Sequence, residues 1–324
     1  MPKSSIKPIL GVDIGGTKVA AGLFTPSGKI LAASRERMVA DRSANEGLKA
    51  VFRAIDRILG DAKAPAARSI GISVPGWVDS RGGRVINAAN LPCWRNYPLA
   101  RKVAQHYGLP AQIANDADAA ALAEATWGAG AHAKNVFYVS LGTGIGTGMA
   151  SQGKVCLGRG GSAFEGGHMT INFEGPQCPC GKRGCIEMYA SGNAIARMAR
   201  ARLRGARPRN SRMLALAGGA ADAITAEIVT RAAKAREKVA LGVLRHSADS
   251  LAIWLGNIID LLEPDVIIFG GGLGHTYIEL LPRIRQQLKH WAINPRHAQI
   301  PIVEARFGAE SALVGAAALC VVAT

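Results

Sequence analysis

A histidine and three cysteines near the middle of the chain have the residue types and spacing of a metal site. His168 stands upstream of the segment Cys178-Pro179-Cys180-Gly181-Lys182-Arg183-Gly184-Cys185. One imidazole and three thiolates, from His168, Cys178, Cys180 and Cys185, make a complete tetrahedral ligand set for zinc. Because such a set leaves no coordination position open, the pattern predicts a structural Zn²⁺ rather than a hydrolytic one.

Two acidic residues flank this cluster. Glu165 lies shortly before His168, and Glu187 lies shortly after Cys185. Carboxylates accept hydrogen bonds from neighbouring hydroxyl groups, which suits a polyol ligand. If zinc takes one nitrogen of His168, the other nitrogen becomes a fixed N–H donor that could hold a sugar hydroxyl.

Three glycine-rich segments follow predicted strands and could cradle phosphates. They are Asp13-Ile14-Gly15-Gly16-Thr17-Lys18, the stretch 141–148 and Gly270-Gly271-Gly272. Glycine lets backbone N–H groups approach an anion closely, while Thr17 and Lys18 add a hydroxyl and a positive charge. Asp13 could hold Mg²⁺ directly or through water. The second segment matches neither the Walker pattern nor the dinucleotide fingerprint. Because three glycine-rich loops stand at strand ends, we expect them to form two half-sites that face a cleft, with nucleotide between them.

The elements that must position these residues alternate between strands and helices, which indicates the α/β class. Asn115 and Asp116 fall between a short strand and an Ala-rich helix, so Asp116 is expected near a helix N-terminus. The pattern at 12–17 returns at 139–144 as a weak internal repeat. Strands are expected over 9–24 (two strands around the glycine turn), 29–33, 69–74, 112–114, 135–141, 145–150, 265–269 and 300–305, and helices over 45–59, 99–107, 117–127, 192–203, 223–238, 241–262, 277–290 and 311–321.

Composition narrows the class of protein. The 324 residues suffice for two domains, and 48% hydrophobic with 19% charged residues fits a globular chain. A net charge of +16 favours anionic ligands, but the arginines over 197–212 have no interleaved aromatic residues to stack bases. No apolar run is long enough to span a membrane, and the first eight residues do not resemble a signal peptide. We expect a cytoplasmic protein that binds neither membrane nor nucleic acid.

These motifs together resemble the ROK family of sugar kinases and sugar-responsive repressors over nearly the whole chain. The most specific parts are Glu165-Gly166-Gly167-His168, the segment 178–187 and Asn115-Asp116-Ala117. The resemblance implies a two-lobed actin/hexokinase-like (ribonuclease H-like) α/β fold with an interlobe cleft and a zinc knuckle. One lobe would comprise 1–125 plus 300–324, and the other 126–299. It also implies a homodimer or homotetramer.

The resemblance assigns a role to each candidate residue, with Asp116 as the catalytic base. MgATP would lie with its phosphates near the first two glycine loops and its adenosine near the third. The sequence departs from the common family pattern at Phe164 and Thr147, where glycine is usual, and at Asp118, where asparagine is usual. The implied sugar-binding residues are Gly76, Asn90, Asn115, Asp116, Glu165, His168 and Glu187, and the implied nucleotide-binding residues are Asp13, Gly15, Gly16, Thr17, Lys18, Thr143, Gly144, Gly271 and Gly272.

The family resemblance implies transfer of the γ-phosphoryl group of ATP to a hexose, and the segments 90–95 and 189–192 look most like glucokinase versions. N-acetylglucosamine, N-acetylmannosamine, mannose, fructose and allose stay open as substrates, and polyphosphate as a second donor. Other functions to weigh are a sugar-responsive repressor and a non-catalytic sugar-binding module. Only eight residues precede the first predicted strand, so we expect no helix-turn-helix module before it.

Overall fold

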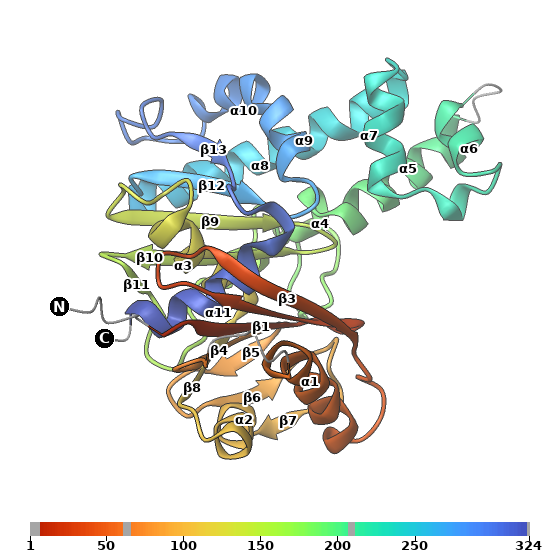
Figure 1. Cartoon of the computed structure of the whole chain (residues 1–324). Helices are drawn as coiled ribbons and strands as arrows, with labels where there is room; N and C mark the ends of the chain where they lie inside the picture. The colour runs from red at the N-terminus through yellow and green to blue at the C-terminus, as the bar shows by residue number, and fades with distance from the viewer. Residues whose placement is uncertain (1–6, 61–65, 207–210, 323–324) are drawn as a thin grey trace. The chain divides into compact units, whose positions relative to one another are not determined.

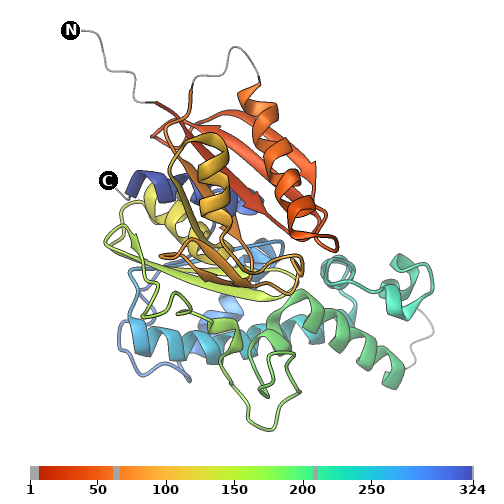
Figure 2. The ribbon, with the colours of Figure 1, turned by 90° about the horizontal axis from the view of Figure 1, so that it is seen from below.

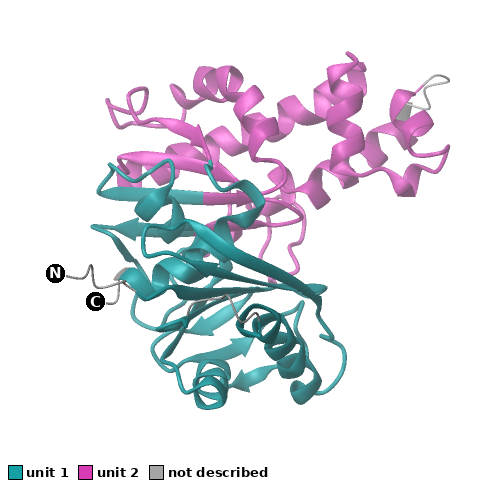
Figure 3. Cartoon of the chain, in the orientation of Figure 1, with its two compact units in different colours: residues 1–138, 148–164, 305–324 teal, residues 139–147, 165–304 magenta. Residues whose placement is uncertain are grey.

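The computed structural model describes residues 7–60, 66–206 and 211–322, and its elements are labelled in Figure 1. The chain forms two compact units, each described here by itself (Figure 3). Unit 1 comprises residues 1–138, 148–164 and 305–324, and unit 2 comprises residues 139–147 and 165–304. Arg207 and Arg209 of the arginine-rich stretch lie outside the described residues. In the described part of the chain, no helix combines the length and hydropathy that crossing a membrane requires.

The compact units differ from the expected lobes in three segments. Residues 126–138 and 148–164 belong to unit 1, and residues 300–304 belong to unit 2. The last helix belongs to unit 1. Residues 302–304 stay with unit 2 because they form a strand that pairs in parallel with the strand ending at Gly270. The interlobe cleft stays a prediction.

The central sheet of unit 1 has the strand order β3-β2-β1-β4-β8. Strand β1 pairs antiparallel with β2 and parallel with β4, which in turn pairs parallel with β8. The carboxyl ends of β1, β4 and β8 therefore meet at one edge of the sheet. The elements of unit 1 are β1 Ile9–Ile14, β2 Lys18–Phe24, β3 Ile30–Arg37, α1 Ala44–Leu59, β4 Ile70–Val74, β5 Trp77–Asp79, β6 Arg84–Asn87, β7 Arg95–Tyr97, α2 Leu99–Tyr107, β8 Ala111–Asn115, α3 Asp116–Trp127, β11 Lys154–Val155, the 3₁₀ turn Gly308–Glu310 and α11 Ser311–Val322.

Alternate residues of β1 serve the two faces of this sheet. Leu10, Val12 and Ile14 belong to the same buried cluster as the apolar face of α1. The opposite face is covered by α11, which lies beside α3 (Figures 1 and 2). A Cβ atom on Gly71 would lie 1.7 Å from the carbonyl oxygen of Ala316, so only glycine permits α11 to pack this closely.

The second sheet has the order β11-β10-β9-β12-β13 and repeats the arrangement of the first. In both sheets a hairpin built around a glycine turn is followed by two further strands that pair in parallel. The weak internal repeat predicted from the sequence is therefore a repeat of strand order. Its strands are β9 Asn135–Leu141, β10 Ile145–Ser151, β11 Lys154–Val155, β12 Val266–Gly270 and β13 Ile302–Glu304.

Helices make up most of the rest of unit 2, and the longest of these, α8, is buried along much of its length. The prediction of a single helix over 277–290 is wrong. One helix ends before Leu280, and a second helix begins after it with Pro282 in its first turn. The helices of unit 2 are the 3₁₀ turn Gly166–His168, α4 Glu187–Ala190, α5 Gly192–Ala206, α6 Arg212–Leu216, the 3₁₀ turn Ala221–Ala223, α7 Ala226–Lys234, α8 Lys238–Leu262, α9 Gly274–Glu279 and α10 Leu281–Leu288.

Candidate active site

Unit 1 gathers several candidate residues at the edge where its three parallel strands end. Asp13 of β1 pairs in register with Ser73 of β4, and Val74 pairs with Asn115 of β8. Asp116 follows Asn115 directly as the first residue of α3. This edge therefore carries the carboxylates of Asp13 and Asp116, as expected for a site at the carboxyl ends of strands.

The carboxylate of Asp13 is largely shielded from solvent. The hydroxyl of Ser73 donates a hydrogen bond of 3.0 Å to its Oδ1 atom. Burial raises the pKa of Asp13 to about 6, with a further upward contribution from the charge of Asp116. A divalent cation at this position would stabilise the ionised form, so Asp13 fits a role as a direct or water-mediated Mg²⁺ ligand.

Asn115 and Asp116 are fixed by the start of helix α3. The side-chain oxygen of Asn115 accepts a hydrogen bond of 2.8 Å from Ala117 N, and its amide nitrogen donates 2.9 Å to the carbonyl of Gly76. The Oδ1 atom of Asp116 accepts 2.9 Å from the same Ala117 N–H. Burial raises the pKa of Asp116, which makes it a stronger base than an exposed aspartate.

The first glycine loop packs against the two other loops of this edge. Gly15 N donates 2.8 Å to the carbonyl of Lys18, which closes the turn. A Cβ on Gly16 would lie 2.7 Å from the carbonyl of Asn90, so glycine lets the loop that carries Asn90 approach. Thr17 and Lys18 are exposed, as a ligand-binding role requires. The structure thus brings Gly76 against Asn115, and Asn90 against the first glycine loop, at the edge that carries Asp13 and Asp116.

Unit 2 brings the other two glycine loops together. Gly271 has φ +75°, and a Cβ there would lie 2.5 Å from the carbonyl of Leu141. Gly192, the first residue of α5, donates from its N–H to the carbonyl of Gly142 at 2.7 Å. Thr143 and Gly272 are exposed next to these contacts. Thr143-Gly144 and Gly271-Gly272 therefore form one surface at the ends of β9 and β12.

The two candidate sugar-binding acids of unit 2, Glu165 and Glu187, belong to segments that approach the start of β10. The Oε2 atom of Glu187, the first residue of α4, accepts 2.8 Å from Ile145 N. Glu165 is exposed and precedes the one-turn 3₁₀ helix Gly166–His168. A Cβ on Gly167 would lie 2.0 Å from the carbonyl of Ile145, so this turn fits only as glycine against the strand. Ile145 thus meets both segments, because its N–H bonds Glu187 and its carbonyl lies close to Gly167.

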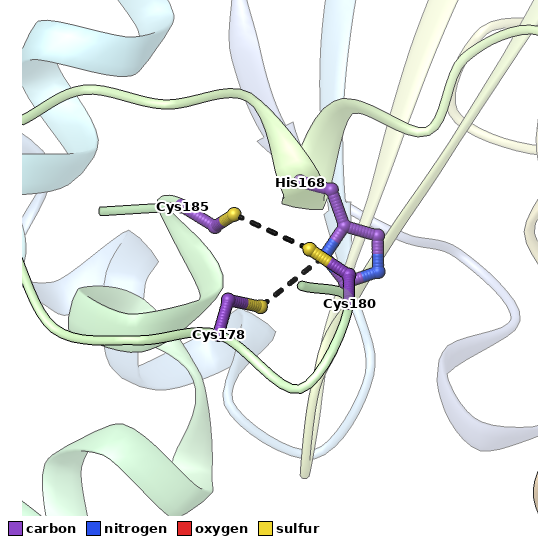
Figure 4. A group of neighbouring side chains, drawn as sticks. All are labelled: His168, Cys178, Cys180 and Cys185. Atoms are coloured by element: carbon purple, nitrogen blue, oxygen red, sulfur yellow. Dashed lines mark hydrogen bonds between the residues drawn. The ribbon is translucent and has the colours of Figure 1, made fainter. Parts of the chain in front are cut away.

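The four predicted metal ligands converge in unit 2 (Figure 4). Their ligand atoms all lie within 4.8 Å of one another. The Nδ1 atom of His168 is 3.7 Å from Cys178 Sγ, and Cys180 Sγ is 3.7 Å from Cys185 Sγ. A disulfide would need roughly 2 Å between the sulfur atoms. Ligands at about 2.3 Å from a tetrahedral zinc stand about 3.8 Å apart, so the donor set fits this ion.

Hydrogen bonds hold the segments that carry the four ligands, and the close approach of the thiols affects their ionisation. Cys178 N donates 2.8 Å to the carbonyl of Lys182, and the ammonium of Lys182 donates 2.7 Å to the carbonyl of His168. Burial, together with the neighbouring Cys180 and Cys178 thiols, raises the pKa of Cys185 to about 12. Three thiols this close ionise together only when a metal ion compensates their charge.

Phe164, one of the departures from the common family pattern, has an unusual backbone. Its φ is +60°, a region that favours glycine, and its ring lies 6.5 Å from the ring of Phe137. The left-handed backbone explains why glycine suits this position, and the contact with Phe137 stabilises the phenylalanine found here. Sequence reasoning missed Ser73 and Trp254, because their roles depend on contacts between distant segments.

Comparisons with known proteins agree with this fold over its whole length. The ROK family profile matches residues 9–322. A glucokinase of Streptomyces coelicolor is 34% identical over 311 residues, which cover 96% of each chain. The structure of a ROK family glucokinase from Streptomyces griseus in complex with glucose and AMPPNP aligns with a TM-score of 0.81 at 34% identity, covering 96% of this chain and 98% of that one.

A regulator is also similar. The structure of a ROK family transcriptional regulator, a homologue of the E. coli MLC protein, aligns with a TM-score of 0.86 at 27% identity, covering 99% of this chain and 80% of that chain. The fold is thus shared by α/β proteins that include both kinases and regulators. The chain belongs to the ROK family.

Proposed function

We propose that this chain is an ATP-dependent hexose kinase that transfers the γ-phosphoryl group to the 6-hydroxyl of glucose. The observation that carries the proposal is the carboxylate of Asp116, which is held through Oδ1 at the start of α3, on the sheet edge that also carries Asp13. The similarity to glucokinases over 96% of the chain supports glucose as the acceptor.

In unit 1, Asp116 accepts the proton of the attacking sugar hydroxyl. Phosphoryl transfer depends chiefly on positioning and charge neutralisation, so the protein needs few groups that react. The backbone of Gly15, Gly16 and Thr17, with the ammonium of Lys18, contacts the phosphates of ATP. Asp13 would hold Mg²⁺, directly or through water, and the ion would supply positive charge beside the phosphates.

In unit 2, Thr143-Gly144 contact the phosphates and Gly271-Gly272 contact the adenosine. Glu165, Glu187 and His168 are the proposed sugar-binding residues, with Asn115, Gly76 and Asn90 in unit 1. Nδ1 of His168 faces the thiols, and its other ring nitrogen lies away from them (Figure 4). That nitrogen is therefore the one proposed to donate to a sugar hydroxyl. Zn²⁺ held by the His/Cys cluster would be structural.

A panel of hexoses tests the substrate. With ATP in a coupled assay that detects ADP release, we expect kcat/KM for glucose to exceed that for N-acetylglucosamine, N-acetylmannosamine, mannose, fructose and allose by at least about tenfold. Polyphosphate in place of ATP tests the second donor. A higher kcat/KM for any other sugar would replace glucose as the substrate. Release of ADP with no phosphate transferred to any of these sugars would contradict the kinase proposal.

The raised pKa of Asp116 predicts the pH dependence of kcat/KM. The ionised carboxylate is the base, so the rate increases as pH rises through the pKa and then levels off. Because burial raises this pKa, the acid limb should lie above the ~3.9 of an exposed aspartate. Asp13 titrates at the same edge of the sheet, so the acid limb gives an apparent pKa of the Asp13–Asp116 pair rather than of Asp116 alone. Circular dichroism at each pH separates unfolding from titration, and a flat profile down to pH 4 in folded protein would contradict the role.

A sugar-responsive regulator is the second candidate, supported by the similarity to the transcriptional regulator. Turnover separates the two functions, because a regulator binds sugar without releasing ADP. A gel shift with DNA at physiological salt tests the regulator directly, since non-specific binding to a basic protein weakens there. We also propose, with the kinase, a cytoplasmic location and a homodimer or homotetramer, which light scattering would measure.

A further inference from the structure

Both backbone polar groups of Gly166 are held by side chains from elsewhere in unit 2. Gly166 N donates 2.9 Å to the hydroxyl of Thr147 on β10. The indole N–H of Trp254 on α8 donates 2.9 Å to the carbonyl of Gly166, which also accepts from Met169 N at 3.1 Å. We call the pair Thr147 and Trp254 the Gly166 clamp.

The clamp is buried and tightly packed. Thr147 is 6% exposed and Trp254 is 0% exposed. A Cβ on Gly166 would lie 2.7 Å from Thr147 Oγ1 and 3.3 Å from the indole of Trp254, so no side chain fits between them. A buried N–H or carbonyl that loses its partner is disfavoured because water cannot replace it. Removing the Thr147 hydroxyl takes the acceptor from Gly166 N, and removing the Trp254 N–H takes from the carbonyl the donor that ties it to α8 and leaves the bond from Met169 N. Either change should therefore shift the Gly166 peptide.

The residues on each side of Gly166 are those proposed to bind sugar and metal. Glu165 precedes it, and His168 ends the same one-turn helix. Within β10, Ile145 and Thr147 lie two residues apart and so on one face of the strand. Ile145 N holds Glu187, and Thr147 holds Gly166. Thr147 and Trp254 thus hold the Gly166 peptide between Glu165 and His168, and Ile145 N, on the same strand as Thr147, holds Glu187.

We infer that Thr147 and Trp254 are positioning residues, which set the Glu165 carboxylate for the sugar and the His168 ring for the thiols. The inference rests on the proposed function for its sugar readout. The effect on zinc release does not depend on that function, because Gly166 holds the segment that carries the ligand His168 whether or not the protein is a kinase.

Three single variants test the clamp. Thr147→Val keeps the volume and removes the acceptor, Trp254→Phe keeps an aromatic ring and removes the donor, and Thr147→Ser keeps the hydroxyl. For the first two we expect a rise of about 10-fold in the KM for glucose with the KM for ATP unchanged, and zinc release to a chelator about 10–100-fold faster. Thr147→Ser should behave as the wild type. The double variant should show less than the product of the single effects, because both groups hold one peptide segment.

The outcomes separate the clamp from the kinase. Folded Thr147→Val and Trp254→Phe proteins with wild-type zinc release and wild-type glucose KM would overturn the clamp. A wild type that phosphorylates no sugar, but whose zinc release responds to the variants, would refute the proposed function and retain the clamp. A chain with neither zinc nor sugar phosphorylation overturns both. If Thr147→Val does not fold, Thr147→Ala takes its place under the same criteria.

Discussion

Replacing Asp116 with asparagine lowers kcat by about 10²–10⁴-fold, the usual contribution of a general base. The amide oxygen can still accept the hydrogen bond from Ala117 N, so the start of α3 and the packing around it stay intact. What is lost is the group that takes the sugar proton. Steady-state kinetics give kcat, while calorimetry with glucose and the melting temperature should match those of the wild type.

Asp118→Asn is the matched control for this experiment. Asp118 is buried two residues further along, in the same first turn of α3, and its replacement removes the same charge from the same helix end. Asparagine is also the residue that the family commonly has there. We expect Asp118→Asn to retain most of the wild-type kcat. An Asp116→Asn protein as active as this control would refute the assignment of the base.

The strands and helices around the candidate site follow from local patterns, which explains why they could be predicted. β1 and β9 are largely apolar runs that are each followed by glycine, and α2 has the predicted bounds Leu99–Tyr107. The three-stranded sheet β5-β6-β7 escaped prediction because its strands are three or four residues long, too short for alternation to stand out.

The functional residues divide in the same way. The three cysteines lie within one short segment, so their spacing alone indicated a shared ligand set. In the sequence Thr147 differs from the glycine usual at this position, and its hydroxyl accepts a hydrogen bond from Gly166 N in the structure. Trp254 is 88 residues from Gly166, and its role depends on the path of α8 through unit 2. No periodicity or spacing in the sequence carries that information.

Removing one zinc ligand should disable the sugar site without touching the base. Wild-type protein should contain about one zinc per chain by elemental analysis, and Cys185→Ser should contain almost none. Cys185 is fully buried, it forms an antiparallel bridge with Thr170, and Ile186 N donates 3.0 Å to the carbonyl of Met169. Because Glu187 follows two residues later, loss of the metal loosens the segment that presents this carboxylate to the sugar.

The expected effect of Cys185→Ser is therefore larger than that of losing a supporting hydrogen bond. We expect kcat/KM for glucose to fall by more than about 100-fold and the melting temperature to drop by at least about 5 °C. Cys156→Ser is the matched control, since Cys156 is a free, half-buried thiol of unit 1 outside the cluster, and it should keep both zinc and turnover. A zinc-free Cys185→Ser protein with wild-type kcat/KM would show that the His168 segment is held by the clamp and β10 alone. The metal would then have no part in shaping the sugar site.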